Sequence, residues 1–184
     1  MIDASKGFTE SKPAGSVFRR QRFGRFMRLV DETLQTKSIC NILDVGGTAS
    51  FWTDNYSLWQ GRNIYVPLLN LQPERVPDER FRSLQGTACA TGFADGQFDV
   101  VHSNSVIEHV GRWRDMKCMA AEVRRVAPRY FVQTPNFWFP LEAHTRFPLF
   151  QVLPEPWRVR LVQARTNGYY PRATTLDEAM AHVE

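Results

Sequence analysis

The stretch Asn41-Ile-Leu-Asp-Val-Gly-Gly-Thr48 decides the fold of this chain. It is a short apolar run that ends in an acidic residue, two adjacent glycines and a polar residue. A buried parallel strand has this form where its carboxyl end runs into a turn beneath a bound ligand. Glycine suits such a turn because it permits positive φ and lets the backbone approach a ligand closely. The stretch therefore predicts a strand that ends in a ligand-binding glycine turn.

Further apolar runs alternate with helical patterns along the chain. We expect the strands at residues 40–45, 63–70, 81–84, 98–103 and 130–133, and the helices at residues 17–36, 51–60 and 113–127. The capping box Thr175-Leu-Asp-Glu178 predicts a last helix. This alternation predicts an α/β fold with a doubly wound, mostly parallel sheet and helices on both faces. In such a sheet the ligand lies outside the carboxyl ends of the strands, between strands one and four.

Two of the expected helices have an apolar face. On the first helix, apolar side chains recur at helical spacing and predict a helix docked on the domain: Phe23, Phe26, Met27, Val30 and Leu34. The helix at residues 113–127 carries on one face Trp113, Met116, Ala120, Val123 and Ala127. Residues 134–150 are rich in proline and aromatic residues and too irregular for one regular element.

Three segments together carry a resemblance to a known family. They are residues 41–48, the segment Phe93-Ala-Asp-Gly-Gln-Phe-Asp-Val-Val-His-Ser-Asn-Ser-Val-Ile-Glu-His-Val110 and the segment Arg125-Val-Ala-Pro-Arg-Tyr-Phe-Val-Gln-Thr-Pro-Asn136. Over roughly residues 38–156 the chain resembles the class I S-adenosylmethionine-dependent methyltransferases, of the kind with a type 11 methyltransferase domain. The resemblance implies a Rossmann-like fold and S-adenosylmethionine as the cofactor.

The resemblance also implies which residues hold the cofactor. The glycine turn would contact the methionine portion and the ribose of the cofactor. The end of strand two would contact the ribose diol, and the loop before strand four would contact the adenine. The residues at these places, with those after strand four, are Asp44, Gly46, Gly47, Thr48, Asn70, Leu71, Thr87, Ala88, Cys89, Ser103 and Asn104. Asn70 and Thr87 stand where the family commonly has acids, so both contacts would be made by neutral groups. For Asp44 a purely structural role in the turn stays open.

Two histidines follow strand ends and are candidates for proton transfer to or from an acceptor. His109 follows strand four with Glu108 beside it, and His144 follows strand five, two residues from Glu142. For Glu108, His109 and His144 a structural role is an equal alternative. His102 lies inside strand four and reads as a core residue. The four residues Glu108, His109, Glu142 and His144 do not have the spacing of a metal site, and we expect no metal.

Bulk properties fit one soluble domain of 184 residues, 43% hydrophobic and 23% charged. We expect a loose tail at residues 1–15, a single domain at 16–184, no membrane span and a cytoplasmic location. The three cysteines, which are widely spaced, read as reduced and buried. The net charge of +4 includes an N-terminal arginine cluster, but no groove-reading motif accompanies it, so nucleic acid is not an expected partner.

The end of the predicted sheet is unusual for the family. Members usually have seven strands, whereas five can be found here. Strand five would then be an exposed edge, which natural proteins normally cover. We expect either a truncated version of a longer protein, or a homo-oligomer or partner that covers this edge.

The leading hypothesis is a methyltransferase that acts on an oxygen or nitrogen nucleophile of a small-molecule or saccharide-type acceptor. The alternative is a non-catalytic relative that uses the fold as a scaffold or interaction module, in keeping with Asn70, Thr87 and the short C-terminus. A nicotinamide-dependent oxidoreductase fits the glycine turn. It does not fit the segment Ser103-Asn-Ser-Val-Ile-Glu-His109, and the chain lacks the longer G-x-G-x-x-G spacing.

Overall fold

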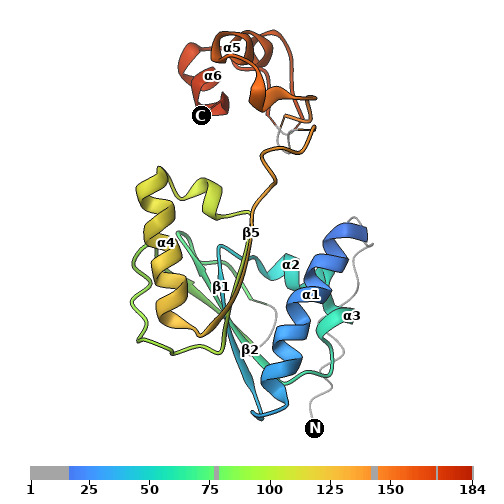
Figure 1. Cartoon of the computed structure of the whole chain (residues 1–184), viewed down its shortest axis with the longest axis vertical. Helices are drawn as coiled ribbons and strands as arrows, with labels where there is room; N and C mark the ends of the chain where they lie inside the picture. Colours follow the sequence, from blue (N-terminus) through green and yellow to red (C-terminus); the bar gives the residue numbers. More distant parts are fainter. Residues whose placement is uncertain (1–16, 77–78, 142–144, 169, 184) are drawn as a thin grey trace. The chain divides into compact units, whose positions relative to one another are not determined.

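The computed structural model describes residues 17–76, 79–141, 145–168 and 170–183 (Figure 1). The chain divides after Thr134 into two compact units, whereas the sequence predicts a single domain from residue 16 to residue 184. The regular elements are α1 Val17–Leu34, β1 Cys40–Val45, α2 Ala49–Asp54, α3 Tyr56–Trp59, β2 Ile64–Asn70, β3 Phe81–Gln85, β4 Val100–Asn104, the 3-10 helix η2 Ile107–His109, α4 Trp113–Val126, β5 Arg129–Gln133, the 3-10 helix η3 Phe150–Val152, α5 Glu155–Ala164 and α6 Leu176–Val183.

The first unit is built on one sheet of five parallel strands in the order β3-β2-β1-β4-β5. β1 lies at the centre, with Asp44 opposite Leu68 on β2 and opposite His102 on β4. The strand order changes direction between β1 and β4, which is the place where open α/β sheets bind ligands. The predicted doubly wound parallel sheet is confirmed, and β5 forms one edge of it.

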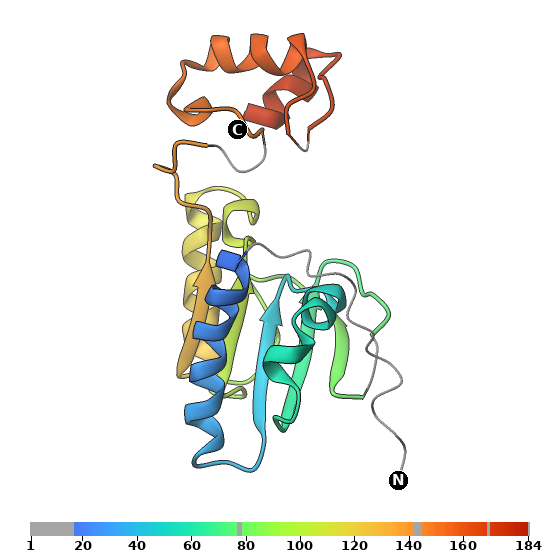
Figure 2. The ribbon, with the colours of Figure 1, turned by 90° about the vertical axis from the view of Figure 1, so that its right-hand side faces the viewer.

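Helices cover both faces of this sheet (Figure 2). On one face α1, α2 and α3 bury Phe26, Trp52 and Trp59 against sheet residues such as Ile42 and Val66. On the other face α4 buries Met119, Val123 and Val126 against Leu43, Val45 and Val101. The carboxyl ends of β1 and β4 between these two layers lead into the loops of the candidate site.

The docking of α1 follows from its apolar spacing. Phe23, Phe26, Met27 and Val30 are all buried, and Leu34 is partly buried, as the sequence predicts. Burying four such side chains stabilises the unit by roughly 6–12 kcal/mol as an upper estimate. The arginines of the same helix lie on its other sides, so α1 brings positive charge to the surface next to the sheet.

Two predicted helices differ from the observed ones. Residues 51–60 form two short helices, because the Asn55 side chain donates from Nδ2 to Phe51 O at 2.8 Å and offers the backbone an alternative to a continuous helix. In α4 the buried residues are Met119, Val123 and Val126, whereas Trp113 is 71% exposed, so the predicted apolar face is wrong in part. The helix face that packs is set by the sheet beneath it, which spacing alone does not locate.

The cysteines also differ from expectation. All three are free thiols, as predicted, but only Cys40 is buried, while Cys89 is half-buried and Cys118 is exposed. Cys118 lies on the outer side of α4 and donates to the carbonyl oxygen of Cys89 at 3.1 Å. The burial of Cys40 in β1 raises the pKa of its thiol to about 11.

The second unit, residues 135–184, has a small core of its own. Phe150, Val162, Ala173, Ala179 and Val183 are buried together. The predicted capping box of α6 is confirmed, since Glu178 N donates to Thr175 Oγ1 at 3.1 Å and Glu178 Oε2 accepts from Thr175 N at 3.4 Å. Helix α5 was not predicted, although Pro154 and Pro156 mark its start. None of the helices within the described ranges is both long and apolar enough to cross a bilayer.

Candidate functional site

The glycine turn after β1 is packed so closely that neither glycine can carry a side chain. Gly46 has φ +72°, and a Cβ there would lie 2.4 Å from Val106 Cγ2. A Cβ on Gly47 would lie 1.9 Å from Asp44 Oδ2. The turn is therefore held between the loop after β4 on one side and the Asp44 carboxylate on the other, and glycine is required at both positions.

Asp44 lies beneath this turn as the centre of a buried hydrogen-bond network. Its carboxylate is fully buried, with Oδ2 accepting from Trp52 Nε1 at 2.7 Å and Oδ1 hydrogen-bonded to His102 Nδ1 at 2.8 Å. The His102 ring is stacked between Phe51 and Phe131, so the prediction that it belongs to the core is confirmed. Asp44 bonds to these side chains rather than to the amides of the turn. These two bonds fit the structural role that the sequence leaves open for Asp44.

The ends of β1, β2 and β3 meet at one edge of the sheet. Gly46 N donates to Leu69 O at 2.8 Å, Asn70 Nδ2 donates to Gly47 O at 2.7 Å, and Gly86 N donates to Asn70 O at 2.9 Å. The amide of Asn70 thus fixes the turn, while within the described ranges nothing donates to its Oδ1. That oxygen remains an acceptor beside the glycine turn, as a ribose contact requires.

The other residues predicted to hold a cofactor differ in exposure and in hydrogen bonding. Thr87 is exposed and its Oγ1 accepts from Cys89 N at 3.3 Å, which closes the short turn that also contains Ala88. Leu71 is 75% exposed. Ser103 is fully buried and donates to Val45 O at 3.0 Å, so it ties β4 to β1. Asn104, which is half-buried, ends β4. Thr48 begins α2 as its N-cap, where its hydroxyl accepts from Phe51 N at 3.3 Å.

Glu108 is the one predicted catalytic residue with an unusual environment. It lies in η2, two residues after the Val106 that packs on Gly46. Both of its carboxylate oxygens are buried, and neither has a hydrogen-bond partner in the part of the chain that the structure describes. A carboxylate withdrawn from water without a partner costs several kcal/mol, so this placement is expensive for the free protein.

The two histidines predicted as catalytic candidates are not supported by a distinctive environment in the described residues. His109, next to Glu108, is exposed. His144 and its neighbour Glu142 lie outside the described residues. Across the described ranges no three His, Cys, Asp or Glu side chains gather in a way that could hold a metal ion.

Sequence reasoning missed Glu74, which lies in the loop after β2. Its Oε1 accepts from Ala49 N, the first backbone amide of α2, at 2.7 Å, and its own N–H donates to Ser83 Oγ at 2.8 Å. The carboxylate therefore sits at the start of the helix that follows the glycine turn. An acid four residues beyond the end of strand two is the signal that could have located it.

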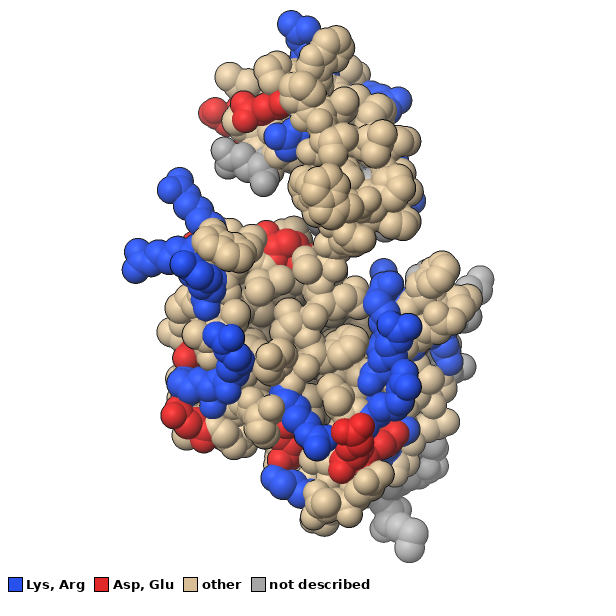
Figure 3. All heavy atoms as spheres, in the orientation of Figure 1, with Lys and Arg blue, Asp and Glu red and all other residues tan. Residues whose placement is uncertain are grey.

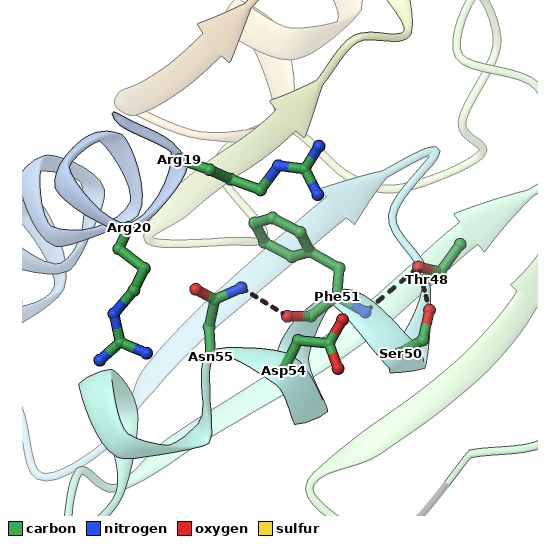
Figure 4. Close-up of a pocket in the computed structure, with 7 residues that line it drawn as sticks. All are labelled: Arg19, Arg20, Thr48, Ser50, Phe51, Asp54 and Asn55. Carbon is green, nitrogen blue, oxygen red and sulfur yellow. Dashed lines mark hydrogen bonds between the residues drawn. The ribbon is translucent and has the colours of Figure 1, made fainter. Parts of the chain in front are cut away.

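A pocket of about 200 Å³ opens between α1 and α2 (Figure 4). Two side chains reach into it from α1 and the others come from α2 and the residues that flank it. The lining residues are Arg19, Arg20, Thr48, Ser50, Phe51, Asp54 and Asn55. Thr48 belongs both to this lining and to the glycine turn, and its hydroxyl is hydrogen-bonded to that of Ser50 at 3.0 Å. The pocket and the turn are thus neighbours.

Comparison with known proteins identifies the region around these loops. Residues 43–129 match the family model of a methyltransferase domain. None of the curated proteins searched matches the chain.

Solved structures with a similar fold include three from different organisms. One is the complex of the Trm112 methyltransferase activator of Haloferax volcanii with a proposed methyltransferase, at 15% identity over 60% of this chain and 51% of that one, with a TM-score of 0.40. Another is an arsenic(III) S-adenosylmethionine methyltransferase from Chlamydomonas reinhardtii, at 19% identity over 48% of this chain and 35% of that one, with a TM-score of 0.37. A third is an S-adenosylmethionine-dependent methyltransferase from Aquifex aeolicus, at 14% identity over 82% of this chain and 87% of that one, with a TM-score of 0.43. The chain spans about half or less of the length of the first two, and similarities this distant say nothing about an acceptor.

Proposed function

Because residues 43–129 match the family model of a methyltransferase domain, we propose that the chain transfers a methyl group from S-adenosylmethionine to a small molecule. The methyl acceptor would be an oxygen or nitrogen nucleophile of a small-molecule or saccharide-type compound. The cofactor would lie outside the carboxyl ends of β1 and β4, against the glycine turn.

The residues at this edge of the sheet fit such a cofactor. Gly46 and Gly47 are only half-buried, which leaves part of the backbone of the turn accessible to the methionine portion, and Asn70 Oδ1 is an acceptor for a ribose hydroxyl. The backbone around Ala88 and Cys89 is left to address the adenine. Asp44 would position the turn without contacting the cofactor, because its carboxylate is hydrogen-bonded to Trp52 and His102.

The observation that carries the proposal is the buried and unpartnered carboxylate of Glu108, held next to the glycine turn through Val106. A group so placed is costly unless a bound molecule supplies its partner. We assign that partner as the O–H or N–H of the acceptor. Glu108 would then accept the proton that the nucleophile loses as it is methylated.

Each part of the chain has a defined task in this mechanism. The bound cofactor supplies a methyl group that is already activated, so the protein needs mainly to align the acceptor and remove a proton. The glycine turn and Asn70 would orient the methyl donor, and Glu108 in η2 would contact the nucleophile. Because the Glu108 carboxylate is buried, the local dielectric is low, and this strengthens its attraction to the positive charge that develops on the acceptor.

A non-catalytic scaffold is the second candidate. It is favoured by the neutral side chains Asn70 and Thr87 at positions where acids commonly hold the ribose and adenine. A scaffold of this kind would bind the cofactor weakly or not at all, so cofactor affinity and turnover separate the two readings.

The Glu108→Gln variant tests the proposal. The full chain is incubated with S-adenosylmethionine and mixtures of alcohols, amines and saccharides, and the S-adenosylhomocysteine formed is quantified. We expect the variant to keep its cofactor affinity and to lose turnover about 10²- to 10⁴-fold, the usual contribution of a positioned base. Equal turnover in both proteins would remove Glu108 from the mechanism, and the absence of both cofactor binding and turnover in a folded wild type would favour the scaffold.

A further inference from the structure

The pocket between α1 and α2 has a positive lining that the proposed methyl transfer does not use. Arg19 and Arg20 contribute two positive charges, and Asp54 contributes the one carboxylate of the described lining. Figure 3 shows that basic side chains gather along α1, the helix that supplies both arginines. The first turn of α1, which supplies both arginines, carries no acidic residue.

Arg20 has a neutral hydrogen-bond partner. It is half-buried, and its Nη2 donates to Ser57 Oγ at 3.1 Å, which is a neutral acceptor. In the described part of the chain no carboxylate pairs with it. A partly desolvated guanidinium with a neutral partner retains donors in a fork that matches a carboxylate or a phosphate.

The lining also has polar groups that can contact an anion. Thr48 and Ser50 bring two hydroxyls to the lining, and Figure 4 shows them on the side of the pocket opposite Arg20. Hydroxyl groups can donate to an anionic oxygen. The Asp54 carboxylate opposes an anion, so the lining as a whole carries a net charge of about +1 and not a strong positive field.

The size of the pocket limits what it can hold. Its volume of about 200 Å³ is smaller than the roughly 300–1,000 Å³ of sites that enclose a whole drug-sized ligand. It therefore suits one group of a ligand whose remainder lies elsewhere. Because Thr48 is shared with the glycine turn, that remainder would lie toward the turn.

We propose that this pocket binds an anionic group, a phosphate or a carboxylate, of the methyl acceptor, with Arg20 as its main partner and Arg19 beside it. The identity of the ligand as an acceptor rests on the proposed function, whereas the binding of an anion does not. The acceptor would then be an acidic small molecule, anchored by its charge on the α1 side of the turn.

The test uses the full chain and two simple probes, inorganic phosphate and acetate, at constant ionic strength set with chloride. Thermal unfolding is followed as each probe is titrated into the wild type, Arg20→Gln and Arg28→Gln. Arg28 is a matched control because it is an exposed arginine of the same helix, about 12 Å further along α1 and outside the pocket. The probe that acts at the lower concentration identifies the anion as a phosphate or a carboxylate.

We expect one of the two anions to raise the unfolding midpoint of the wild type and of Arg28→Gln equally. The apparent affinity of Arg20→Gln should be about tenfold lower, as for loss of a charge-assisted hydrogen bond. Equal responses of all three proteins, or no response to either anion, would overturn the proposal.

A second variant keeps the test decisive if Arg20→Gln does not fold. Ser50→Asp adds a carboxylate to the pocket at the first turn of α2, where a negative charge favours the helix, and it should abolish the anion response. An undiminished response in this variant would also overturn the proposal.

Titration with S-adenosylhomocysteine separates this inference from the proposed function. Arg20→Gln should bind that compound as the wild type does, because Arg20 lies on α1 and is not one of the residues assigned to the cofactor. An anion response in a chain that does not bind S-adenosylhomocysteine would leave the anion site standing and overturn its assignment to a methyl acceptor.

Discussion

At the scale of single residues, two glutamates illustrate opposite uses of a carboxylate. Glu122 on α4 accepts from Arg125 Nε at 2.7 Å and from Thr91 N and Oγ1 at 3.0 and 2.9 Å. The Arg125 hydrogen bond, helped by Thr91, lowers its pKa to about 2. Among the described residues Glu108 has no such partner, although its oxygens are buried. One carboxylate stabilises the free protein, while the other costs free energy that only a bound molecule recovers.

These environments predict opposite effects of the same substitution. Glu122→Gln should lower the free energy of unfolding by about 1 kcal/mol at neutral pH, because a partly exposed ion pair is lost. Glu108→Gln should raise it by about 1 kcal/mol, because an unpaired buried charge is removed. Urea unfolding of both variants and the wild type measures the two differences, and the same sign for both would contradict this account.

The Glu122 contribution should also depend on pH with a definite sign. Its folded pKa of about 2 lies below the ordinary value of 4.5, so the ionised form is the one that stabilises the fold. The stability advantage of the wild type over Glu122→Gln should be complete above about pH 4.5 and should vanish as the pH falls through about 2. Urea unfolding at several pH values checks this, and an advantage that grows on acidification would refute it.

At the scale of elements, α2 is attached to the centre of the sheet by a single polar network. Trp52 on α2 donates to Asp44 on β1, and Asp44 in turn is bonded to His102 on β4. Because Gly47 lies against the same carboxylate, the network also sets the position of the glycine turn. The helix, two strands and the turn are thus expected to move together if one member is lost.

Trp52→Phe should therefore destabilise the first unit by about 1–3 kcal/mol, since it leaves Asp44 Oδ2 buried without a donor. Trp157→Phe is the control, because Trp157 is exposed on α5 and should change stability by less than about 0.5 kcal/mol. Chemical unfolding of the two variants measures the difference. Equal stabilities would mean that the indole bond is not what holds α2 in place.

The elements also show how far the sequence leads. The five strands were predictable because short apolar runs bounded by glycine or proline are visible in the local sequence. Helix α1 was predictable because its apolar residues recur at helical spacing. The break at Asn55 and the buried face of α4 were not, since both depend on contacts with the sheet. Gly46 and Gly47 lie in the turn after β1 where the sequence pattern predicts such a turn, whereas the burial of Glu108 and the contact of Glu74 with α2 arise only when distant loops meet.

At the scale of the whole molecule, the parallel sheet of the first unit collects every described candidate group at the carboxyl ends of its strands. The turn after β1, Asn70 after β2, the Thr87 turn after β3 and Glu108 after β4 come from four separate loops of one sheet. The second unit, with its own core around Phe150 and Val162, is a separate compact element of the chain. The proposed cofactor cleft therefore depends on the first unit.

Calorimetric titration of the full chain with S-adenosylhomocysteine tests the central claim, that the cofactor lies on the glycine turn next to Asn70. We expect binding by the wild type, and about 3- to 10-fold weaker binding by Asn70→Ala, which loses one hydrogen bond to the ribose. Asn63→Ala, which lies before the start of β2 and whose side chain bonds Ser38 O, is the control and should bind as the wild type does. No binding by a folded wild-type chain, or equal affinity of Asn70→Ala and Asn63→Ala, would contradict the account.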